Sequence, residues 1–75
     1  MSYNIFVKNK FAERLNELLI ENKMSKRELA KKIGVSATSI SDWSTGKICP
    51  TVENVYLIAE FFQISADYLI GLKDI

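Results

Sequence analysis

The chain has 75 residues, of which 48% are hydrophobic, so it is long enough for one small domain and too apolar for a disordered segment. It has no histidine and only one cysteine, which excludes an imidazole base, a thiolate metal site and an internal disulfide. Its net charge is only +1. No apolar run is long enough to span a bilayer, and the N-terminus does not resemble a signal peptide. We therefore expect a cytoplasmic protein that is not an enzyme and needs no cofactor or metal.

The small net charge hides an uneven distribution of charge along the chain. Residues 1–22 sum to zero and residues 51–75 to −3, whereas residues 23–50 carry six basic side chains against two acidic ones, a net +4. A local positive segment is suited to binding a polyanion, although we interpret Lys31 and Lys32 as lysines that solvate a helix surface.

The first predicted helix covers roughly residues 9–22. Its apolar residues recur at the spacing of one helix face, with glutamates around the other side. The apolar face consists of Phe11, Leu15, Leu18 and Leu19. Residues 3–7 are also apolar and are compatible with a strand, an extra turn of helix or an arm, so residues 1–8 are interpreted as an N-terminal arm or extension.

Two short helices joined by a tight turn are predicted between residues 25 and 45. Ser25 followed by Glu28 is the pattern of a reciprocal capping box, and Gly34 can take the left-handed conformation that ends a helix. Ser36 then provides the N-cap of the second helix. The side chains expected in the core are Leu29, Ala30, Ile33, Ile40 and Trp43.

Two further helices are predicted after a loop at residues 46–50. Thr51 is the expected N-cap of a helix that runs to about residue 62, and Ser65 is expected to cap a last helix that ends at Gly71. The buried stripe of the longer helix is predicted to be Val52, Val55, Ile58, Ala59 and Phe62.

The whole pattern predicts an all-α fold, a compact bundle of about five helices. Residues 73–75 are expected to form a C-terminal tail. The lone Cys49 is expected to be a small, semi-buried loop residue rather than a redox sensor.

The free face of the helix at residues 37–45 carries the functional signal. At 100° per residue, five small or polar side chains fall within an arc of about 140°, with Ile40 and Trp43 on the other side. Small side chains let a helix approach closely, as a major groove about 12 Å wide requires, although they can also be neutral filler. The five are Ala37, Thr38, Ser41, Asp42 and Thr45.

Four segments together resemble the helix-turn-helix domain of the phage repressor and Cro family of bacterial regulators, also called the XRE family. They are SxxELAxxIGVS at 25–36, SISDWSTGK at 39–47, Pro50 and ISADYLIGL at 64–72. The resemblance implies a lambda-repressor-like DNA-binding domain at residues 9–72. It also implies a homodimer that inserts the helix at residues 37–45 into the major groove of double-stranded operator DNA, with the chain acting as a repressor.

The resemblance implies which residues read bases. Thr38 and Ser41 can donate to or accept from base edges, Ala37 can pack against a thymine methyl, and Asp42 can accept from cytosine N4. Relatives often use longer Gln, Asn or Arg side chains at such positions. We therefore expect modest direct readout, with some discrimination left to DNA shape.

The positions expected to contact phosphates flank this face. Lys26 opens the preceding helix, where the backbone N–H and the helix dipole favour an anion, and Lys47 matches another phosphate-contact position of the family. Ser36 and Thr45, at the two ends of the reading face, also suit phosphate contacts.

A dimer interface is predicted on the last two helices. Leu57 and Phe61 lie four residues apart, opposite the buried stripe, and Tyr68 is expected near them. Exposed apolar side chains gathered together often mark an interface, and the family usually dimerises through its C-terminal helices. The alternative is that residues 3–7 fold back and cover these side chains.

The same fold serves several tasks, so a protein-interaction module or an antitoxin remains the alternative function. The sequence indicates neither a small-molecule ligand nor a membrane partner.

Overall fold

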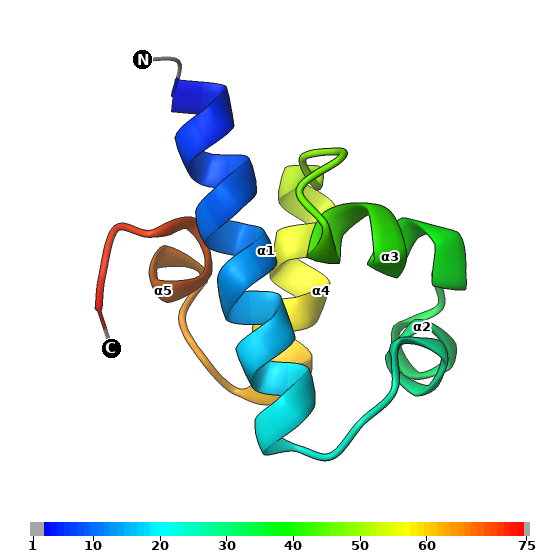
Figure 1. Ribbon diagram of the computed structural model, residues 1–75. Helices are drawn as coiled ribbons and strands as arrows, with labels where there is room; N and C mark the ends of the chain where they lie inside the picture. Colours follow the sequence, from blue (N-terminus) through cyan, green and yellow to red (C-terminus); the bar gives the residue numbers. More distant parts are fainter. Residues whose placement is uncertain (1–2, 75) are drawn as a thin grey trace.

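Five α-helices joined by short loops account for most of residues 3–74, the part of the chain described by this computed structural model, which contains no strand (Figure 1). They are α1 (Tyr3–Glu21), α2 (Lys26–Ile33), α3 (Ala37–Ser44), α4 (Val52–Phe62) and α5 (Ala66–Ile70). The expected all-α, five-helix architecture is confirmed. None of the helices in these residues combines the length and apolar character needed to cross a bilayer.

α1 is longer at its start than the sequence pattern predicted. It begins at Tyr3 rather than near residue 9, so most of the expected N-terminal arm is helix. Of the three forms left open for residues 3–7, the structure has the helical one. Phe6 lies beside Gly71, where a Cβ would come within 3.0 Å of its ring. The first two residues, and Ile75 of the expected tail, lie outside the described residues.

The core forms where α1 packs against the other helices. α1 runs through the middle of the molecule, with α2 and α3 on one side and α5 on the other (Figure 1). Its predicted apolar face is buried as expected, and the rings of Phe11 and Trp43 meet edge to face with centroids 6.5 Å apart. The side chains with no accessible surface are Phe11, Leu15, Leu29, Ile40, Ile58 and Leu69.

The predicted buried stripe of α4 is correct except at its start. Ile58 and Ala59 are buried, and Val55 and Phe62 pack partly buried against the core, but Val52 is 85% exposed. α5 has five residues, about 7.5 Å of helix, against about 16 Å for the eleven residues of α4. The short α5 cannot cover the whole of α4, so the first turn of α4 stays open.

Arg14 fastens the segment after α5 to α1. Its buried guanidinium donates to the backbone carbonyls of Tyr68 and Lys73, lies 3.8 Å from the Asp74 carboxylate, and stacks 4.2 Å from the centroid of the Tyr68 ring. The described part of the expected tail is therefore held against α1.

Candidate nucleic-acid interface

Local hydrogen bonds hold α2 and α3 in a defined relation. The Ser25 N–H donates to Glu28 Oε1 and the Glu28 N–H donates to Ser25 Oγ, each at 3.0 Å, which is the predicted capping box. Gly34 ends α2 with φ 76°, and the N–H groups of Gly34 and Val35 both donate to Ala30. Ser36 then caps α3 by accepting from the Ser39 N–H at 3.0 Å. These bonds leave little freedom in the turn between the two helices.

The capping box also affects the charge at the start of α2. The hydrogen bonds from the Ser25 backbone and side chain lower the pKa of Glu28 below its ordinary value of 4.5. The carboxylate form is thus favoured, and it lies in the first turn of the helix, where a negative charge interacts well with the helix dipole.

The inner side of α3 is anchored in the core. Ile40 has no accessible surface and Trp43 is 5% exposed, so Trp43 is a core residue, as predicted. The Asn16 side-chain amide of α1 donates to the Ser44 carbonyl at 2.7 Å, which fixes the C-terminal end of α3 against α1. The helix is held along one side only.

The predicted base-reading residues lie on the other side of α3. Ala37 and Thr38 in the first turn are exposed, and Ser41 and Asp42 one turn later are half-buried. The polar side chains are short, so this face brings the helix backbone close to whatever binds there.

The residues predicted to contact phosphates lie in α2 and at the two ends of α3. They differ in whether their side-chain donors already take part in hydrogen bonds. Lys26 at the start of α2 and Lys47 in the loop after α3 are both exposed, and the Lys47 N–H donates to the Asp42 carbonyl at 2.9 Å. The Ser36 hydroxyl shares a 2.9 Å hydrogen bond with that of Ser39. The Thr45 hydroxyl donates to the Ser41 carbonyl at 2.9 Å, so it must break this bond before it can donate to a phosphate. Of the four residues predicted to contact phosphates, the two exposed lysines therefore have the freer side chains.

The three residues predicted for the dimer interface have different surroundings. Leu57 is half-buried, and Phe61 is 37% exposed and meets Phe62 edge to face. The ring of Tyr68 lies under the Arg14 guanidinium and its hydroxyl is 3.4 Å from a Glu17 oxygen, so its contacts are with α1. This surface stays a prediction.

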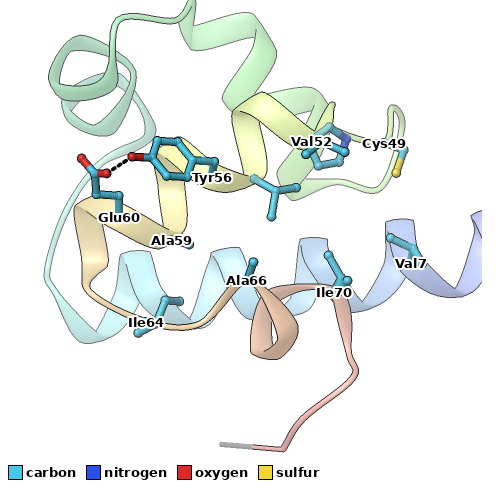
Figure 2. Close-up of a pocket in the computed structure, with 11 residues that line it drawn as sticks. Val7, Cys49, Val52, Tyr56, Ala59, Glu60, Ile64, Ala66 and Ile70 are labelled. Carbon is cyan, nitrogen blue, oxygen red and sulfur yellow. Dashed lines mark hydrogen bonds between the residues drawn. The ribbon is translucent and has the colours of Figure 1, made fainter.

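A hollow of about 750 Å³ is bounded by α4, α5 and the start of α1, and it was not predicted from the sequence (Figure 2). Val52 and Tyr56, four residues apart on α4, line this hollow, and no local pattern in the sequence predicts it. Cys49, expected to be semi-buried, is exposed at its edge, because the loop before α4 runs over the surface.

Comparisons with known proteins agree with this geometry. The helix-turn-helix family model matches residues 15–69. The chain is 40% identical over 63 residues to the cryptic phage CTXphi transcriptional repressor RstR of Vibrio cholerae, covering 83% of this chain and 55% of the relative. It is 32% identical over 65 residues to the HTH-type transcriptional activator BcrR of Enterococcus faecalis, covering 87% of this chain and 32% of the relative.

The chain thus spans between about a third and just over half the length of these curated relatives. A solution structure of the SOS-response transcriptional repressor LexA from Eubacterium rectale superposes with a TM-score of 0.81 at 33% sequence identity. The match covers 85% of this chain and 68% of that one.

Proposed function

The chain belongs to the helix-turn-helix family of transcription regulators, of the XRE type, and from this premise we propose that it is a repressor that binds operator DNA as a homodimer. Proteins of this family are DNA-binding regulators and not enzymes, in agreement with the expectation from the sequence. Bacterial DNA lies in the cytoplasm, which is where such a repressor acts.

The observation that carries the proposal is the two-sided construction of α3. Ile40 and Trp43 anchor one side of the helix in the core. On the other side, Ala37 and Thr38 are exposed and Asp42 is half-buried. A helix with a short, polar outer side fits the major groove, where each base pair presents a distinct pattern of donors and acceptors. We assign direct base reading to Ala37, Thr38, Ser41 and Asp42.

Exposed cations close to α3 support the same docking. Lys26 and Lys47 come from the segments before and after the base-reading helix, so they can contact the phosphate backbone on either side of it. Phosphate contacts fix the register of a protein on DNA without carrying sequence information. Ser36 and Thr45 are secondary candidates because their hydroxyls already take part in hydrogen bonds within α3.

The geometry of DNA supports the proposed homodimer. Two half-sites one helical turn apart require two recognition helices about 34–36 Å apart, related by a two-fold axis. The domain extends 33 × 24 × 21 Å, so two copies side by side suit that spacing. The proposed operator is therefore a palindrome. Repression is the simplest outcome of occupying it, and the 40% identical relative is named a repressor.

The experiment that tests the proposal is selection of bound sites from randomised duplex DNA at one stated salt concentration. We expect enrichment of a palindromic sequence whose half-sites are about 10 base pairs apart. Binding should also weaken steeply with salt, because phosphate contacts release counterions. If no sequence is enriched at low salt and another protein copurifies tightly with the chain, the interaction-module function replaces the repressor.

A further inference from the structure

One side-chain hydrogen bond joins α1 to the end of α3. The amide of Asn16, half-buried in the C-terminal half of α1, donates to the Ser44 carbonyl at 2.7 Å, although the two residues are 28 positions apart in the sequence. Ser44 is the last residue of α3 and is 5% exposed. In Figure 1, α3 starts beside α2 and turns its C-terminal end toward α1. Asn16 therefore connects the central helix of the core to the helix proposed to read bases.

This bond differs from the others that satisfy the end of α3. The last four carbonyls of an α-helix have no partner within the helix itself. In the described chain, the carbonyls of Ser41, Asp42 and Trp43 accept from backbone N–H groups of residues 45–48, which follow directly. The Ser44 carbonyl accepts from another helix instead. At this carbonyl, the end of α3 is fastened to α1 by a directed bond.

The directed bond adds a constraint that apolar packing does not supply. The contact between the rings of Phe11 and Trp43 holds α3 against α1, but the hydrophobic effect is not directional. A hydrogen bond weakens steeply when its donor and acceptor move out of line, so it limits how far α3 can turn or slide. Ser44 transmits this constraint to the middle of the helix, because its hydroxyl donates to the Ser41 carbonyl at 3.0 Å.

We propose that Asn16 is a positioning residue that determines how well the second turn of α3, with Ser41 and Asp42, discriminates between bases. The proposal rests on the proposed function and adds a residue that acts through α3 rather than by touching a base. Recognition side chains keep their geometry only when the groups behind them are themselves fixed by packing and hydrogen bonds.

The first turn of α3 is held by a separate set of bonds. Ser36 caps the helix by accepting from the Ser39 N–H at 3.0 Å, next to the turn that follows α2. Thr38 lies in this first turn. Loss of the Asn16 amide should therefore displace the second turn more than the first, because the helix stays held at its start.

Selection of sites from randomised duplex DNA with Asn16→Leu tests the proposal. Leucine is a good helix former without a donor, so the variant loses the bond to Ser44 and should still fold, which circular dichroism checks. The base pair read by the second turn is the one whose preference changes in Asp42→Ala. Discrimination at that pair should fall from about five-fold or more to less than about two-fold, while the preference at the pair read by Thr38 is kept.

Asn22→Leu is the matched control. The Asn22 amide also donates to a backbone carbonyl, that of Leu18 at 2.8 Å, but both groups lie at the C-terminal end of α1. The variant loses a bond of the same kind without changing how α3 is attached, so it should keep the parent's profile. Asn16→Gln is the rescue variant. It keeps an amide donor one methylene further out and should restore part of the discrimination that leucine removes.

Nuclear magnetic resonance of the free protein tests the contact without DNA. The Thr45 amide nitrogen shares a peptide group with the Ser44 carbonyl, so its chemical shift reports bonding to that carbonyl. We expect this signal to move in Asn16→Leu and to stay in place in Asn22→Leu. We also expect a scalar coupling across the hydrogen bond between Asn16 Nδ2 and the Ser44 carbonyl carbon. An absent coupling together with an unchanged Thr45 shift overturns the proposal.

Two results of the selection also overturn the proposal. One is an Asn16→Leu profile identical to that of the parent. The other is an equal loss of preference at every base pair, including the one read by Thr38, which indicates a general weakening of the fold.

Failure of this proposal and failure of the proposed function remain distinguishable. A parent that selects no sequence refutes the repressor, and the discriminating role of Asn16 with it. A parent that selects a palindrome, which Asn16→Leu then selects with the same preferences, refutes only the role of Asn16.

Discussion

Trp43 and Thr38 belong to the same eight-residue helix and have opposite surroundings. The Trp43 ring is buried and packs edge to face against Phe11, while Thr38 is exposed on the outer side. The side chains that pack in the core and those proposed to read DNA therefore lie within about one turn of the same helix. Substitutions on the two sides should therefore change different measurable quantities, stability on one side and sequence preference on the other.

Trp43→Ala tests the buried side. Removing a buried aromatic ring costs about 3–5 kcal/mol of unfolding free energy, most of the stability expected of so small a domain. Urea denaturation followed by circular dichroism should show the loss, with Ile20→Ala as an exposed control that changes stability by less than about 0.5 kcal/mol. A Trp43→Ala protein that unfolds at the parent's urea concentration but no longer binds DNA would show that the two sides of α3 are assigned the wrong way round.

Lys26→Ala and Lys47→Ala test the proposed phosphate contacts. Each should weaken binding nearly equally for all sequences and reduce the slope of log affinity against log salt by about 1. Lys31→Ala is the control, because Lys31 is an exposed lysine that we interpret as solvating α2. Unchanged affinity of both variants at low salt would mean that the protein docks on DNA in another orientation.

At the scale of elements, every helix after α1 begins with a serine or threonine cap. Ser25, Ser36, Thr51 and Ser65 each accept a hydrogen bond from a backbone N–H three residues later. Helices of five to eleven residues are marginal in water on their own, so such caps and the packing against α1 hold them.

Glu28→Gln tests the capping box through its pH dependence. The hydrogen bonds from Ser25 hold the folded-state pKa of Glu28 below 4.5, so the carboxylate stabilises the fold above about pH 4.5 and this contribution is lost as the pH falls through the lower, folded-state value. Glutamine keeps a capping-box acceptor without the charge. The difference in thermal midpoint between parent and variant should therefore favour the parent near neutral pH and shrink below pH 4.5. A difference that stays constant down to about pH 3 would contradict the assignment.

The features that the sequence predicted are those set by neighbouring residues. Caps such as Ser25 and the left-handed Gly34 are local patterns, and the buried face of α1 follows from helical spacing alone. By contrast, Gln63 ends α4 with φ 57°, a left-handed conformation that its residue type does not predict. The free face of α3 was predictable for the same reason as its buried face, because Ile40 and Trp43 fix how the helix is turned.

The features that the sequence missed depend on how distant elements meet. Val52 has the spacing of a core residue, but α5 is too short to cover it, which no local pattern reveals. The same holds for Arg14, whose partners lie more than fifty residues away, and for the hollow bounded by α1, α4 and α5.

At the scale of the whole molecule, Arg14 links the first helix to the end of the described chain. Its contacts reach Tyr68 and two residues after α5, so α1 and the C-terminal segment stabilise each other. Arg14→Met should lower the unfolding free energy by about 2–3 kcal/mol, because two backbone carbonyls lose a charged donor. Denaturation by urea measures this loss. Asp74→Ala, at the fully exposed end of the ion pair, should stay within about 0.5 kcal/mol of the parent, and an Arg14→Met protein as stable as that control would contradict the role given to Arg14.

Sequence reading by the proposed repressor depends most directly on the outer face of α3. Selection of sites from randomised duplex DNA, at one salt concentration, should be run with the parent, Thr38→Ala, Asp42→Ala and the Lys31→Ala control. We predict that the first two variants change the preferred base at one or two positions in each half-site, by roughly 1–3 kcal/mol per affected base pair, while Lys31→Ala keeps the parent's profile. Identical profiles for all four proteins would contradict the assignment of sequence reading to α3.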